Sequence, residues 1–140
     1  MHKVYKIFTY GTLMTGEHNN YILKDSKYIG VDKIKGYSMY DMNFGFPFII
    51  NSSKRDIVIG EVWEVDYNTL QRLNMLEGYI EDGYNNHYDR VSVVSQNGHE
   101  CIVYVYKEFP RTPFIKCTRK TWSHEVNKKH FRYTSPYRNK

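Results

Sequence analysis

The 140-residue chain has only two cysteines, Cys101 and Cys117, and no CxxC pair. So few cysteines exclude a disulfide scaffold and are typical of a reducing compartment, where an isolated thiol is usually a small buried apolar group. The six histidines have neither HExxH spacing nor a cysteine partner at zinc-finger spacing. Because Cys101 lies in an alternating, strand-like run, we interpret it as a structural thiol and not as a nucleophile.

Long apolar runs are also missing from the sequence. No stretch approaches the roughly 18 apolar residues that a membrane-spanning helix needs, and the segment from Met1 to Lys6 lacks the apolar run of a secretory signal. The length suits one domain with a single core. These features favour a soluble, cytoplasmic protein without a membrane partner, and they say nothing about its oligomeric state.

Acidic residues are scarce near the C-terminus. Residues 111–140 hold nine Lys or Arg and one acidic residue, a net charge of +8, whereas the other 110 residues hold 11 basic and 14 acidic groups, a net charge of −3. Aromatic residues such as Trp122 and Phe131 are interleaved with these basic ones. Such a segment fits a solvated or partner-docking surface, and it also fits nucleic-acid binding through phosphate contacts and base stacking.

Strand-like patterns dominate the remaining sequence, and an Asn97-Gly98 turn joins the last two as a hairpin. One helix is predicted to begin at Asp66 or Asn68, because leucines at positions 70, 73 and 76 recur about once per turn. A short helix capped by Asn19 or Asn20 is expected before it. The predicted fold is α+β, a small, mixed, β-barrel-like sheet, curved or closed, with a few short helices. The expected strands cover residues 3–10, 28–34, 37–42, 57–65, 88–95 and 100–106. We predict one domain over residues 1–110 and a basic aromatic extension over residues 111–140, packed on the domain or trailing from it.

The first candidate functional motif is Tyr10-Gly11-Thr12-Leu13, where a buried strand runs into glycine. Consecutive backbone N–H groups in such a loop can form a concave site for a carboxylate or an oxyanion. An ordinary turn, in which glycine supplies an unusual dihedral angle, explains the same residues. The pattern alone leaves both interpretations open.

The second candidate is Glu77, which follows the last leucine of the predicted helix and precedes Gly78, a suitable C-terminal cap. A carboxylate at this end meets the negative pole of the helix dipole, which costs up to about 1 kcal/mol and raises its pKa. A carboxylate with a raised pKa suits a general base near neutral pH. Most glutamates, however, are solvated surface groups.

Taken together, these motifs resemble the γ-glutamylcyclotransferase-like family, particularly its γ-glutamylamine cyclotransferase branch. The loop of that family reads approximately YGTL-x-x-G-x-x-N, and the residues from Tyr10 to Asn19 match it. Leu73–Tyr79 resembles the family's L-D-x-x-E-G segment, whose glutamate is the catalytic group. Tyr88–Arg90 resembles its Y-x-R, Ile59–Val65 its G-E-V/L-Y-x-V strand, and Val103–Tyr106 a late aromatic strand. The chain departs from the family at Asn74, where Asp is usual, and after residue 106.

The resemblance implies a cofactor-free and metal-free reaction on a small γ-glutamyl substrate. The α-amine of the glutamyl group attacks its own γ-carbonyl, which closes 5-oxoproline and releases an amine. It implies that Glu77 is the acid/base catalyst and that Tyr10, Gly11, Thr12 and Leu13 bind substrate through their backbone. The Tyr88 hydroxyl is a candidate donor to the substrate, and a buried tyrosine that donates to the backbone explains this residue equally well. Two alternatives are a non-catalytic ligand-binding protein of the same fold, which has no need of Glu77, and a nucleic-acid-associated protein that acts through residues 111–140.

Overall fold

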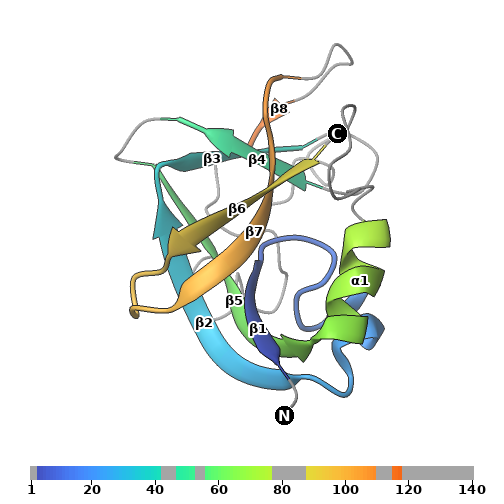
Figure 1. Cartoon of the computed structure of the whole chain (residues 1–140). Coiled ribbons are helices and arrows are strands. Elements are labelled where there is room, and N and C mark those ends of the chain that lie inside the picture. The colour runs from blue at the N-terminus through green and yellow to red at the C-terminus, as the bar shows by residue number, and fades with distance from the viewer. Residues whose placement is uncertain (1–2, 42–46, 53–55, 77–87, 110–114, 118–140) are drawn as a thin grey trace.

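The computed structural model describes residues 3–41, 47–52, 56–76, 88–109 and 115–117, with only the backbone of Tyr88. These residues form a strand-rich fold with one α-helix and one short 3-10 helix, η1 (Figure 1). None of the helices in these ranges is long and apolar enough to cross a membrane. The elements in chain order are β1 (Val4–Thr9), η1 (Asn20–Leu23), β2 (Lys27–Lys35), β3 (Tyr37–Asp41), β4 (Pro47–Asn51), β5 (Ile57–Asp66), α1 (Tyr67–Leu76), β6 (Tyr88–Val94), β7 (Glu100–Tyr106) and β8 (Ile115–Lys116).

All eight strands belong to one mixed sheet with the order β2-β5-β1-β7-β4-β3-β8, and β6 pairs with β7. Besides β6, strand β7 pairs with two different strands along its length. Ile102 of β7 pairs with Ile7 of β1, whereas Tyr106 pairs with Ile50 of β4, and both pairings are parallel. Strand β1 ends at Thr9, so the sheet parts beside the middle of β7, that is, β1 and β4 diverge there. The chain leaves the sheet at this point as a loop. This parting is the feature that positions the candidate site.

Helix α1 begins directly after β5, where the Asp66 carboxylate accepts a hydrogen bond of 2.8 Å from the backbone N–H of Thr69. Capping by an aspartate satisfies one of the N–H groups that the first turn leaves unpaired. Leu70 and Leu73 are buried against the sheet, whereas Met75 is 81% exposed. The predicted start and the buried leucine face of this helix are confirmed. Leu76, which was expected on the same face, is exposed.

The core has two main parts, as expected for strands that bury side chains on both faces. One cluster contains Ile7 of β1 and Trp63 of β5, together with Leu73 of α1. The other contains Phe8 and Val62, which are adjacent to Ile7 and Trp63 in the same two strands and project in the opposite direction. The alternation along β1 and β5 therefore puts apolar side chains on both sides of the sheet.

The predicted α+β class with a mixed sheet and short helices is confirmed, but the sheet is open, because the end strands β2 and β8 are not paired with each other in the described ranges. Strand β4 is absent from the predicted strands, because the proline at its start and the asparagine at its end are typical of breaks, although its three middle residues are buried. Ile115–Lys116 of the predicted extension pairs with β3. The division of the chain near residue 110 stays a prediction, since residues 118–140 lie outside the described ranges.

Candidate active site

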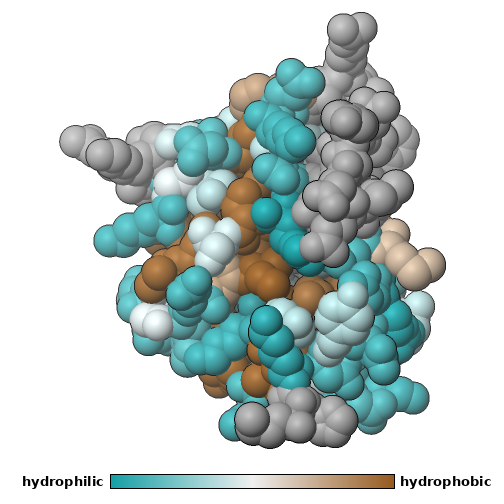
Figure 2. Space-filling view, in the orientation of Figure 1, coloured by the Kyte–Doolittle hydropathy of each residue, from teal (hydrophilic) through white to brown (hydrophobic). Residues whose placement is uncertain are grey.

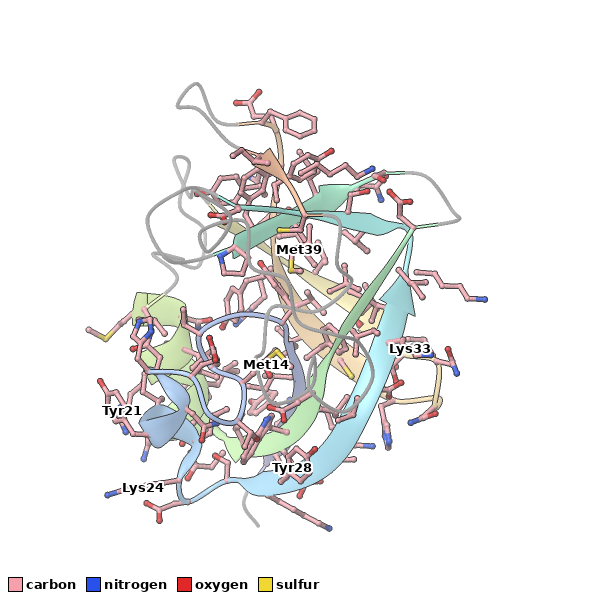
Figure 3. All side chains as sticks on the ribbon, turned by 180° about the vertical axis from the view of Figure 1, so that it is seen from behind. Met14, Tyr21, Lys24, Tyr28, Lys33 and Met39 are labelled. Carbon is pink, nitrogen blue, oxygen red and sulfur yellow. The ribbon has the colours of Figure 1, made fainter. Side chains whose placement is uncertain are left out.

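The segment between β1 and η1 (residues 10–19, here the β1–η1 loop) curls between the end of β1 and helix α1 (Figures 1 and 3). Its carbonyl groups are turned into the loop itself. The Gly11 carbonyl accepts a hydrogen bond from the Met14 N–H at 3.1 Å, and the Thr12 carbonyl accepts one from the Asn19 N–H at 2.9 Å. The Leu13 carbonyl accepts one from the side-chain amide of Asn20 at 2.8 Å. The loop is thus closed by its own backbone.

This closure decides where two N–H groups point. The N–H and C=O of a trans peptide unit point in opposite directions, and every peptide unit of the described residues is trans. Since the carbonyls of Gly11 and Thr12 turn inward, the N–H groups of Thr12 and Leu13 turn outward. Within the described residues, the N–H groups of Gly11, Thr12 and Leu13 donate to no other group. This arrangement suits an anionic oxygen.

Tyr10 and Tyr104 connect the β1–η1 loop to helix α1. The Tyr10 hydroxyl donates a hydrogen bond of 2.7 Å to the backbone carbonyl of Tyr104, in the middle of β7 where the sheet parts. The hydroxyl of Tyr104 in turn donates to the side-chain oxygen of Asn74 on α1. All three residues are buried. The last turn of α1 is therefore held beside the strand position from which the loop departs.

Two of the predicted site residues cannot be placed by these contacts. Glu77 directly follows Leu76, the last residue of α1, and lies outside the described residues. The backbone of Tyr88 pairs with Tyr106 of β7, but its side chain is likewise outside the described part of the chain. The structure therefore brings together Tyr10, Gly11, Thr12 and Leu13 of the predicted set. The roles of Glu77 and Tyr88 stay predictions.

Glu61 is a residue of this region to which the sequence interpretation assigned no role. It is only 2% exposed, and its carboxylate accepts hydrogen bonds from the Thr15 N–H at 2.7 Å and from the Trp63 indole N–H at 3.4 Å. A signal was available in the sequence, because Glu61 interrupts the apolar run of β5 and its neighbours Val62 and Gly60 carry no charge. Charged residues are rarely fully buried unless they are paired.

A hydrophobic surface lies beside the loop. Figure 2 shows apolar side chains gathered at the middle of one face, near β7 and the β1–η1 loop, with hydrophilic side chains around them. On β4 and β7, the aromatic rings of Phe48 and Tyr106 stack with their centroids 4.6 Å apart. A region of low polarity next to outward N–H groups strengthens their interaction with a bound anion.

Comparison with known proteins now identifies the family. The family model described as "Gamma-glutamyl cyclotransferase, AIG2-like" matches residues 7–124, most of the chain. The chain belongs to this family. The matched range includes the β1–η1 loop, helix α1 and all strands except the first residues of β1. The predicted resemblance and the enzyme class of gamma-glutamylcyclotransferases are thus confirmed at the level of the family.

Individual relatives agree with this assignment. A protein of Methanocaldococcus jannaschii assigned as a gamma-glutamylcyclotransferase is 39% identical over 103 residues, which cover 71% of this chain and 81% of that protein. The gamma-L-glutamyl-butirosin B gamma-glutamyl cyclotransferase of Niallia circulans is 33% identical over 104 residues, which cover 71% of this chain and 65% of that protein. The crystal structure of a protein from Pyrococcus horikoshii superposes with a TM-score of 0.68 at 27% identity and covers 94% of this chain and 99% of its own.

Other side chains of this cyclotransferase-family protein suit structural roles. Cys101 is 1% exposed, and burial, together with the nearby charge of Asp32, raises the pKa of its thiol to about 11. Such a thiol is protonated at neutral pH and is a poor nucleophile. In the described part of the chain, no three His, Cys, Asp or Glu side chains lie together in a way that could hold a metal ion.

The link between loop and helix can be tested with Tyr104→Phe, which keeps the ring and removes the hydroxyl. We expect the free energy of unfolding to fall by about 1–3 kcal/mol, because a buried hydrogen bond is lost and the Asn74 side chain keeps an unsatisfied atom. Urea denaturation measures the change. Tyr21→Phe is the matched control, since Tyr21 is 63% exposed and its hydroxyl is open to water. Equal losses in both variants would contradict the proposed contribution of this hydrogen bond.

Proposed function

We propose that this family member is a cofactor-free cyclotransferase that releases an amine and 5-oxoproline from a γ-glutamyl amide or γ-glutamylamine. The observation that carries the proposal is the set of outward N–H groups at the tip of the β1–η1 loop, fixed by inward carbonyls. In a γ-glutamyl substrate, these groups would hold the α-carboxylate or the oxyanion that develops on the γ-carbonyl. Family membership supports the γ-glutamyl part of the substrate.

The reaction needs one group that first takes a proton and later gives it back. The substrate's α-ammonium loses a proton to the carboxylate of Glu77, and the freed nitrogen forms a bond to the γ-carbonyl carbon. The leaving nitrogen takes the proton from Glu77 as its bond to that carbon breaks. The new ring nitrogen still carries one extra proton, which it gives up to the released amine through the same carboxylate, so that the products are 5-oxoproline and the ammonium form of the amine. Since both reacting groups belong to one molecule, correct folding of the substrate supplies most of the advantage. A single carboxylate suffices for these proton transfers.

The placement of helix α1 supports this role for Glu77. The tie from Tyr10 through Tyr104 to Asn74 holds the helix end beside the loop, and Glu77 is the next residue after that end. The Tyr88 hydroxyl is proposed as a further donor to the substrate, because β6 pairs with β7 beside the same region. The name of the Niallia circulans relative refers to γ-L-glutamyl-butirosin B, which supports a substrate with a γ-glutamyl group.

The direct test is a screen of wild-type protein against γ-glutamyl amines, γ-glutamyl dipeptides and glutathione, with 5-oxoproline as the readout. We expect 5-oxoproline and free amine in equal amounts from at least one γ-glutamyl amine. An α-N-acetylated form of the same substrate is the matched control, because its nitrogen cannot attack. Release of amine with glutamate in place of 5-oxoproline would contradict the proposal, and binding without turnover would favour the non-catalytic alternative.

A further inference from the structure

Three consecutive residues of β5 contact the end of β1 and the β1–η1 loop. Ile59 packs against Met14, which is fully buried between the loop and β5 (Figure 3). Gly60 lies so close to β1 that a Cβ atom there would be 2.1 Å from the Thr9 carbonyl oxygen. Glu61 accepts the hydrogen bond from the Thr15 N–H. The loop is therefore seated on one short stretch of the sheet.

Fold stability does not explain a carboxylate at position 61. Its neighbours on the same face of β5 are Ile59, Trp63 and Val65, all buried apolar residues. A buried carboxylate must give up its hydration, and a well-packed apolar side chain in such a place is often neutral or stabilising. The carboxylate does accept the part-buried hydrogen bond from the Thr15 N–H, but a neutral acceptor can satisfy a single N–H group as well. What the carboxylate adds is a fixed position for this peptide unit.

The peptide unit between Met14 and Thr15 is the point at which the loop is fixed to the sheet. Its carbonyl accepts from the Glu17 N–H at 2.9 Å, and its N–H donates to Glu61 at 2.7 Å. Both polar atoms of the unit are thus engaged, one within the loop and one with the sheet. The outward N–H groups at Thr12 and Leu13 lie directly before this unit in the chain. The Trp63 indole, the second donor to Glu61, limits the movement of the carboxylate.

We propose that Glu61 is a positioning residue of the substrate loop, which holds the Met14–Thr15 peptide unit so that the outward N–H groups of Thr12 and Leu13 stay aligned for an anionic oxygen. The inference rests on the proposed function. A hydrogen bond to a charged acceptor is shorter and stronger than one to a neutral acceptor. The charge of Glu61 also affects the neighbouring Tyr28, because burial of Tyr28, together with this charge, raises the pKa of the Tyr28 hydroxyl.

The test compares Glu61→Met, which has no strong acceptor, with Glu61→Gln, which keeps an acceptor oxygen. Glu64→Gln is the matched control, because it makes the same change on β5 at a residue whose partners in the sheet are Lys6 and Lys27. We expect kcat/KM to fall roughly ten-fold or more in Glu61→Met and to be largely restored in Glu61→Gln. A rise in KM indicates that the loop holds the α-carboxylate of the substrate. A fall in kcat indicates that it holds the oxyanion that develops during the reaction.

An NMR measurement separates this inference from the proposed function. The Thr15 amide proton is expected to shift upfield and to exchange faster with solvent in Glu61→Met, and 5-oxoproline added as the probe is expected to bind more weakly. These readouts hold even if no tested γ-glutamyl compound is turned over, an outcome that would count against the proposed function alone. An unchanged Thr15 amide in Glu61→Met overturns the inference. If that variant does not fold, Glu61→Gln decides, since its neutral acceptor must also move the Thr15 signal.

Discussion

Glu77→Gln is expected to lower 5-oxoproline release by about a hundred- to ten-thousand-fold, the usual contribution of a general acid/base. The amide neither takes the proton from the substrate's α-ammonium nor returns it to the leaving nitrogen, so both halves of the reaction lose their proton carrier. Steady-state kinetics with the best substrate from the screen measures the effect. Thermal unfolding of the variant checks that lost turnover does not reflect lost folding.

Two comparisons make this result specific. Glu64→Gln removes the same charge from the neighbouring strand β5 and is expected to leave turnover unchanged. Binding of 5-oxoproline to Glu77→Gln should persist, because the N–H groups of the β1–η1 loop do not depend on the side chain of Glu77. Undiminished turnover in Glu77→Gln would contradict the proposed mechanism and would indicate that another carboxylate of the site transfers the proton.

Gly60→Ala is expected to destabilise the fold strongly, although it adds only one methyl group. An added Cβ atom would lie 2.1 Å from the Thr9 carbonyl oxygen and 2.7 Å from the Phe8 ring. The oxygen is a backbone atom of the paired strand, so β1 and β5 must separate. We expect a loss of about 3 kcal/mol in the free energy of unfolding, the upper end for overpacking, and a fall of roughly 10 °C in Tm.

Gly98→Ala separates crowding from backbone strain in that experiment. Gly98 has φ +87° in the β6–β7 turn, and the position that an added methyl group would occupy is open space, so only the dihedral angle opposes alanine. A cost of about 1 kcal/mol is expected there. Thermal unfolding of both variants gives the comparison. If Gly60→Ala is no less stable than Gly98→Ala, the close approach of β1 and β5 does not limit the fold.

The elements that the sequence predicted well are those with strong local signals. The helix at Tyr67–Leu76 has a capping aspartate and periodic leucines, and the β6–β7 hairpin has Asn97-Gly98, whose glycine takes φ +87° as such a turn requires. Strand β4 has no such signal. Pro47 supplies no N–H and resembles a break, but its strand is formed by pairing with the preceding strand β3 and with β7, which lies far along the chain. Pairing between distant segments decides its conformation, and local propensity does not.

The residues of the candidate site show the same difference between local signals and long-range contacts. Tyr10–Leu13 and Glu77 were found through motif order, since neither rises above a turn or a surface glutamate by itself. Asn19 was considered a helix cap, but its side-chain amide donates to the Thr12 hydroxyl at 2.9 Å and makes no capping bond to η1. The contacts of Glu61 and Tyr104 join residues 46 and 30 positions apart in the chain. Only tertiary structure brings such partners together, so the sequence marks Glu61 as unusual without indicating which residue it contacts.

The parting of the sheet beside β7 has a consequence for how the protein is made. The Tyr10 hydroxyl finds its acceptor 94 residues later in the chain, at Tyr104. A ribosome that adds about 5–20 residues per second completes that distance only several seconds after the loop has been synthesised. Contacts of such long sequence separation also form slowly, because much chain entropy is lost before they are made. The nascent N-terminal segment is therefore expected to reach its native conformation only after β7 has been translated.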